Sequence, residues 1–308
     1  MTTATHRFRW RRVLALCAAS VLLHFMVLGW GSGQLAAPAP APAAAFVAEL
    51  RSAPSLTPVP EAGAANPLPQ VQLPGPPEKA RRADAARPRY KVSLPPSAQL
   101  RFDVVRVDTN GSAGAGHAVL DWRHGGGQYR ITMTGEVAGA VPVELASEGA
   151  TGVGGMVPRT MNAQRGGKAG TATHFNVQRG RITFSASEGS VAMAPGTQDK
   201  ASLPLQLAGI ARAGRRQLGA GLEILVAEEK DAGVLRFEVV GQEEIDTRMG
   251  RIATWRLSQS PIPGTYKARL EVWLAPGHDW YPVQLRSTEA NGTVTTRTIN
   301  EIVLHDGT

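Results

Sequence analysis

Apolar and polar residues alternate with a period of two along most of the chain after residue 99. In the first such run, Leu100, Phe102 and Val104 are apolar, whereas Arg101 and Asp103 are polar. This period is typical of β-strands with one buried face. The runs predicted as strands are 100–108, 117–122, 128–137, 141–148, 172–177, 181–187, 222–229, 234–247, 251–258, 266–275, 281–289 and 293–303.

Short glycine-rich connections join these runs. Asn110-Gly111 is typical of a tight hairpin turn, and Asn291-Gly292 joins the last two runs in the same way. The glycines at 125–127 and 166–167 are interpreted in the same way, because they lack the strand–loop–helix context of a phosphate-binding loop. The pattern predicts a mainly β fold, a curved antiparallel meander that forms a half-barrel, a barrel or a sandwich.

One stretch has a helical rather than a strand period. From Asp199 to about Gln217, apolar residues recur at the spacing of one helix face, and Asp199 is suited to the N-cap. Pro204 would fall in the first turn, where proline is tolerated. We expect one amphipathic helix whose apolar face closes the end or the concavity of the sheet.

The N-terminal region predicts a membrane anchor. Residues 1–12 form a basic cap with four arginines, and residues 13–30 are an apolar run whose helix would be about 27 Å long, close to the thickness of a bilayer. No charge follows until Glu49, so the positive-inside rule places the N-terminus in the cytoplasm and residues 90–308 in the periplasm. We therefore expect a single-pass protein of the inner membrane.

Two alternatives to an uncleaved anchor remain open. A secretory signal peptide would need a small-x-small cleavage site, and residues 34–36 (Gln-Leu-Ala) fit that pattern poorly. A lipoprotein signal would need a small residue before its cysteine, whereas Leu16 precedes Cys17. The length of the apolar run favours the uncleaved anchor.

A proline- and alanine-rich spacer, 31–89, follows the predicted anchor. Residues 1–89 contain 12 of the 22 prolines of the chain. Proline fixes φ and removes the amide donor, so a polyproline-like, solvated segment is expected. Such a spacer would hold the β domain away from the membrane.

Inside the predicted anchor, Ser20 and His24 are four residues apart and would share one helix face. A histidine in lipid is costly enough to suggest a function. This pair, followed by a proline-rich span, resembles the anchors of TonB-type energy transducers, which implies docking onto an ExbB–ExbD-type motor complex. The alternative is a neutral His24 that bonds to Ser20 or to a backbone carbonyl without any partner protein.

Charge and cysteine content exclude several classes of function. Residues 1–89 hold 10 Lys/Arg against 4 Asp/Glu, whereas residues 90–308 hold 23 against 21. The folded part is therefore nearly balanced, which argues against nucleic acid as a partner. The single cysteine, Cys17, lies in the apolar run, so the β domain has no disulfide, thiolate metal site or cysteine nucleophile.

A search for catalytic motifs leaves only isolated polar residues. The histidines of the β domain are scattered singly, and no metal, cofactor or catalytic group is predicted. Candidate ligand contacts are Gln198, Asp199, Arg159, Arg165 and Trp273. For Gln198 and Asp199 the alternatives are polar contacts at a cavity mouth, or a helix cap with Gln198 bonding a strand edge.

Several ordered motifs in the segment 100–302 resemble the bacterial family of domain of unknown function 3108. They occupy residues 147–149, 155–158, 198–199, 240–247 and 272–276. The resemblance implies a β-rich fold and an envelope address, but no activity.

Three functions are compatible with these observations. The leading hypothesis is a non-enzymatic periplasmic binding or carrier-like module for an apolar, lipid-like or amphipathic ligand of the envelope. The second is a structural or assembly factor that presents the β domain to envelope protein partners. A hydrolase is a remote third, because it would need a polar cluster that the sequence does not show.

Overall fold

The structure is a computed structural model that describes residues 90–260 and 268–306. Every described residue lies in the unit Val71–Thr308. The predicted cap, anchor and spacer, which together span residues 1–89, lie outside the described residues, and so do Ser20 and His24. Within the described part, no helix is both long and apolar enough to cross a membrane.

In the described residues, the fold is one largely antiparallel sheet with one α-helix. The first eight strands are β1 (Ala98–Val107), β2 (Ala113–Gly125), β3 (Gln128–Val137), β4 (Val143–Gly152), β5 (Gly155–Arg165), β6 (Thr171–Asn176), β7 (Arg181–Phe184) and β8 (Ser187–Ala192). There follow β9 (Gln198–Asp199), α3 (Leu203–Ala213), the 3-10 helix η1 (Arg215–Ala220), β10 (Leu222–Ala227), β11 (Ala232–Thr247), β12 (Gly250–Gln259), β13 (Arg269–Leu274), the 3-10 helix η2 (Pro276–His278), β14 (Pro282–Thr288) and β15 (Val294–Leu304).

The strand order confirms the predicted meander. It runs β8-β7-β6-β5-β4-β3-β2-β1-β15-β14-β13-β12-β11-β10-β9, so neighbours in sequence are neighbours in the sheet, and the first and last long strands pair at its middle. Among the described strands, only the short β9 pairs in parallel, with β10. The sheet is single and open, which rules out the closed barrel and the two-sheet sandwich among the predicted alternatives.

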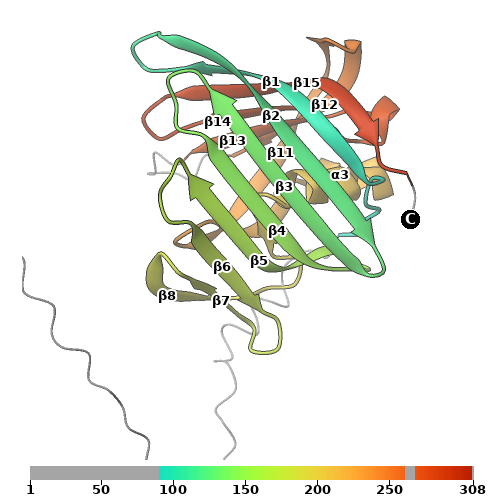
Figure 1. Ribbon diagram of the computed structural model, residues 1–308. Helices are drawn as coiled ribbons and strands as arrows, with labels where there is room; N and C mark the ends of the chain where they lie inside the picture. Colours follow the sequence, from blue (N-terminus) through green and yellow to red (C-terminus); the bar gives the residue numbers. More distant parts are fainter. Residues whose placement is uncertain (1–89, 261–267, 307–308) are drawn as a thin grey trace, which may run out of the picture. The chain divides into compact units, whose positions relative to one another are not determined.

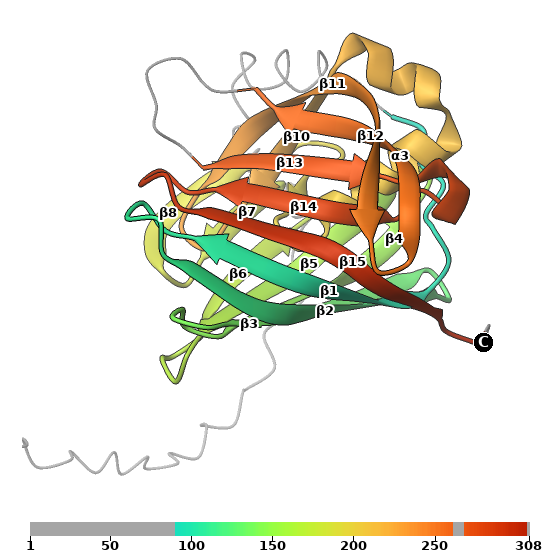
Figure 2. The same cartoon turned by 90° about the horizontal axis from the view of Figure 1, so that it is seen from above.

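The open sheet curls around the helix. Figures 1 and 2 show β2–β5 on one side, β10–β13 on the other, and α3 between them. The two halves touch near their ends, since Met161 and Phe175 from β5 and β6 share a hydrophobic cluster with Leu225 of β10. The face that carries this core is called the inner face below, and the opposite face is called the outer face.

The predicted runs overlap strands, but β5, β8 and β9 were missed. In β5, Pro158 interrupts the expected pattern because proline cannot donate to a ladder. The strand tolerates it at a bulge, where the register with β4 shifts between Glu148 and Gly149. Most residues of β8 are exposed, and β9 has two residues, so neither has a periodic signal.

The helix is shorter and more deeply buried than predicted. It begins after Ser202 rather than at Asp199, because Gln198 and Asp199 are already engaged with β10 as strand β9. It ends before Gly214, and η1 occupies most of the remaining predicted length. The predicted helix packs its apolar residues into the sheet, and in addition every residue from Leu203 to Ala211 is buried, the polar Gln206 included. The cause is its position between the two halves of the sheet.

The β11–β12 hairpin folds back over the outer face of the sheet. A register shift between Val239 and Gly241 bends it, and its distal half crosses the neighbouring strands (Figure 2). Arg248 at its tip forms an ion pair with Asp103 of β1. Trp273 of β13 is thereby covered on the outer face, and only 4% of it is exposed.

Candidate functional site

One pocket lies beside α3, where Gln206 and Ile210 on one face of the helix line it together with the β4–β5 turn and β10. Its volume is about 480 Å³. Val153 in the β4–β5 turn, Ile210 of α3 and Ile224 of β10 contribute apolar surface. Gln206 and Glu223 contribute polar groups to the same lining.

Hydrogen bonds fix the walls of this pocket. The Gln206 side chain accepts from the Met156 backbone N–H at 3.0 Å and donates to the Gly154 carbonyl at 2.8 Å, so it ties α3 to the β4–β5 turn. Gly155 adopts φ +91°, and a Cβ there would lie 2.3 Å from Gln206 Oε1. The Glu223 backbone N–H donates to the hydroxyl of Tyr90 at 2.8 Å. The pocket is therefore preformed rather than a gap between mobile side chains.

Asp199 lies inside the core, with no exposed surface. Its Oδ1 accepts from the backbone N–H groups of Ala201 and Ser202, at 2.9 and 2.8 Å. Its Oδ2 accepts from Ser147 Oγ at 2.5 Å, and Ser147 Oγ lies 2.9 Å from the hydroxyl of Tyr129. Burial raises the pKa of Asp199 above its ordinary value, although these hydrogen bonds oppose the shift. The carboxyl group joins the start of the helical region to β3 and β4.

The Gln198 side chain forms a hydrogen bond to a strand, as expected from the alternative in which Asp199 caps the helix. Its Nε2 donates to the Met156 carbonyl of β5 at 2.9 Å. Its Oε1 is buried and has no hydrogen-bond partner among the described residues. Gln198 and Asp199 are fully buried and do not line this pocket, although Gly196 nearby in sequence does, and their role in binding a ligand stays a prediction.

The two predicted arginines lie apart from this buried pair. Arg159 has an exposed side chain and lies 3.2 Å from Glu148. Arg165 is also exposed and lies 3.5 Å from Glu229. Burial alone would raise the pKa of Glu229, but its hydrogen bond to Lys200 holds the pKa below the ordinary value. Both arginines thus take part in ion pairs.

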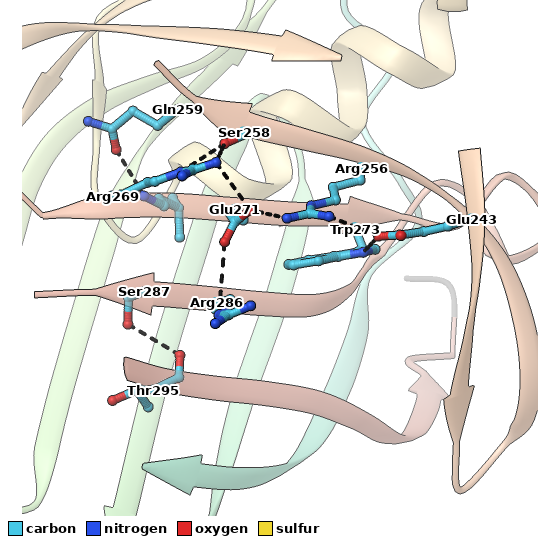
Figure 3. Close-up of polar contacts among 11 residues, drawn as sticks. Glu243, Arg256, Ser258, Gln259, Arg269, Glu271, Trp273, Arg286, Ser287 and Thr295 are labelled. Carbon is cyan, nitrogen blue, oxygen red and sulfur yellow. Dashed lines mark hydrogen bonds and ion pairs between the residues drawn. The ribbon is translucent and has the colours of Figure 1, made fainter. Parts of the chain in front are cut away.

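Trp273, the last predicted contact, belongs to a charged cluster on the outer face of β12–β14 (Figure 3). The Glu271 carboxylate, 5% exposed, lies 2.5 Å from Arg256, 3.5 Å from Arg269 and 3.9 Å from Arg286. The Arg256 guanidinium lies 5.0 Å from the ring centre of Trp273, whose indole N–H donates to Glu243 of the folded-back hairpin. The cluster holds the hairpin against the sheet.

Arg297 of β15 was missed by the sequence reasoning. It pairs with Val104 of β1 and Leu285 of β14, and directly paired residues point to the same face. Both partners are buried core residues, so the partly exposed Arg297 side chain points to the inner face. Desolvation lowers the pKa of its guanidinium, and no described residue forms a hydrogen bond or ion pair with it. Arg297 is two residues from the apolar Ile299, and this spacing indicates that both side chains point to the same face of the strand. The signal was weak because polar residues occupy both faces of this strand.

These features define a β domain with one curled sheet, a buried helix and a preformed pocket. In the described ranges, no three His, Cys, Asp or Glu side chains are grouped so that they could hold a metal ion. The family model described as "Protein of unknown function (DUF3108)" matches residues 104–298, and the chain belongs to this family. The resemblance of the segment 100–302 to this family is thereby confirmed, and the resemblance of the N-terminal region to TonB-type anchors stays a prediction.

Other comparisons add little about function. A search of curated proteins gave no match. Among solved structures, the chain is similar to a LolA superfamily protein from Nitrosomonas europaea, at 10% identity over 74% of this chain and 92% of that one. The TM-score is 0.22, too low for this likeness to indicate a ligand.

Proposed function

We propose that this domain is a non-enzymatic binding module for an apolar or amphipathic ligand of the cell envelope. The observation that carries the proposal is the preformed pocket of about 480 Å³ beside α3. Ligand sites typically have volumes of this order, with mostly apolar walls and a few placed polar groups. Here Ile210 and Ile224 supply apolar wall, and Gln206 and Glu223 supply polar groups.

The inner face also retains accessible apolar surface away from this pocket. Met133 and Val137 of β3 and Leu270 of β13 pack against the core but are only partly buried. Their presence supports an interior that takes up apolar material. The predicted anchor, 13–30, and spacer would hold the module on the periplasmic side of the inner membrane, and this address is part of the proposal.

The test is to identify what the protein carries. The full-length chain is purified and extracted with organic solvent, and the extract is analysed by mass spectrometry. We expect a lipid-like molecule in a constant ratio to protein. Val153→Trp at the pocket, where the valine is 97% exposed, should lower that ratio. Val177→Trp, at an exposed turn outside the pocket, is the matched control.

An extract without bound lipid, combined with no uptake of added lipid by the purified chain, would contradict the proposal. Equal loss of lipid in both tryptophan variants would also count against the pocket, because it would point to a general effect on folding. Loss in Val153→Trp alone supports it.

A second function, assembly with an envelope protein, is favoured by one observation. Strand β8 ends the sheet, and most of its residues are exposed. A free strand edge presents backbone groups that another strand can pair with. A photo-crosslinking residue at Glu188, introduced in cells, should then trap a protein partner, whereas the same residue at Val177 should not.

A further inference from the structure

We infer that Arg297 binds the anionic head group, a carboxylate or a phosphate, of an amphiphile held against the inner face of the sheet. This inference rests on the proposed function and names the chemical class of its ligand, although Arg297 lies outside the pocket beside α3 and would contact the ligand at the inner face. The apolar part of the molecule would contact the partly buried residues of the same face, such as Val137 and Leu270.

The position of Arg297 carries the first part of the inference. Strands β1 and β15 lie at the middle of the strand order, and the sheet curls around its interior. A side chain on the inner face of β15 therefore points to the region that both halves enclose. Thr295 and Ser287 form the next inward-facing pair of the ladder, and the Ser287 hydroxyl lies 3.5 Å from the Thr295 carbonyl.

The missing partner carries the second part. Among the residues that the structure describes, other inward or covered arginines are compensated: Arg106 pairs with Glu289 at 2.8 Å, and Arg256 pairs with Glu271 at 2.5 Å. No described residue pairs with Arg297. A desolvated cation is costly unless it is paired and hydrogen-bonded. An anion bound in the interior would supply the compensating charge.

The chemistry of guanidinium narrows the ligand. Its planar set of N–H donors matches the two oxygens of a carboxylate or phosphate group. The apolar neighbours Val104 and Leu285 on either side of Arg297 would not solvate a small hydrated anion. An anion with an attached hydrocarbon chain satisfies both the charge and the apolar surface.

The experiment compares laurate with lauryl alcohol, which has the same chain and no charge. The full-length chain is placed in lipid nanodiscs, so that its predicted membrane segment stays soluble without free detergent. We expect the chain to bind laurate at least about tenfold more tightly, the lower end for a hydrogen bond to a charged group. Arg297→Gln should reduce this preference to about twofold or less, and Arg297→Lys should retain part of it.

Arg101→Gln is the matched control, because Arg101 lies on the adjacent strand β1 with an exposed side chain on the opposite face. It should leave the preference unchanged. Thermal unfolding without ligand gives a second measurement. Arg297→Gln should be at least as stable as the native chain, because it removes an uncompensated desolvated charge.

Each outcome decides between the two proposals. If the native chain binds laurate and lauryl alcohol equally, the proposed function stands and the role of Arg297 is wrong. If it binds neither, both fail. A preference that persists in Arg297→Gln, or a loss of stability beyond that of Arg101→Gln, also overturns the inference. Binding of inorganic phosphate that depends on Arg297 would show a free anion as the ligand, not an amphiphile.

Discussion

Replacing Asp199 tests how the start of the helical region is held. Asp199→Ala would leave the N–H groups of Ala201 and Ser202 without an acceptor in a fully buried site. A buried donor left unsatisfied costs about 1–3 kcal/mol, and Ser147 loses an acceptor as well. Removal of a desolvated carboxyl group offsets part of this cost. We expect a net loss of about 2–5 kcal/mol in the free energy of unfolding, a large share of the stability of a typical domain.

Asp199→Asn is the informative partner of this change. Its Oδ1 can still accept from both backbone amides, and its amide group can donate to Ser147 Oγ. We therefore expect Asp199→Asn to lie within about 1 kcal/mol of the native chain. Urea unfolding can be followed through tryptophan fluorescence, to which the fully buried Trp122 contributes. If Asp199→Asn is as damaging as Asp199→Ala, the negative charge itself is required and the reasoning is refuted.

The pH dependence provides a separate check on Asp199. Its pKa is raised in the folded state, so folding favours the neutral carboxyl group. The contribution of this group to stability is therefore complete below the pKa of the unfolded chain, about 3.9, and is lost as pH rises through the higher folded-state pKa. The difference in unfolding free energy between the native chain and Asp199→Asn should follow this sign. A native chain that gains stability over Asp199→Asn as pH rises would contradict the assignment.

Two further substitutions test the pocket wall and the outer cluster. Gly155→Ala should destabilise the protein more than Gly126→Ala: both glycines have positive φ, worth about 1–2 kcal/mol, but only at Gly155 would the new Cβ lie 2.3 Å from Gln206 Oε1. Equal losses in urea unfolding would show that the side chain of Gln206 yields freely. Glu271→Gln should lower the free energy of unfolding by about 1–3 kcal/mol, because Arg256 and its neighbours lose their carboxylate partner. This loss should be smaller at high salt, which screens the ion pairs of the native chain. A loss that salt does not change would contradict the ion-pair explanation.

The sequence by itself determined the elements that depend on local spacing. The period-two alternation around Leu100 and Phe102 places both in the core, and the glycines at 111 and 292 supply the positive φ that their turns require. It also predicted the polar bonding of Asp199 and Gln198, because a carboxylate before an apolar helical run commonly accepts backbone amides.

Only the tertiary structure decided how the sheet closes and what its interior holds. Whether a meander of this length forms a barrel, a sandwich or an open curl depends on packing between residues far apart in sequence, such as the cluster that holds both Met161 and Leu225. The same holds for the helix: α3 is buried all round because both halves of the sheet pack on it, which its own sequence cannot show. Arg297 is the clearest case. In sequence Arg297 is one polar residue among threonines. Only its pairing with Val104 and Leu285 shows that its side chain points to the inner face, where it is desolvated and has no charged partner among the described residues.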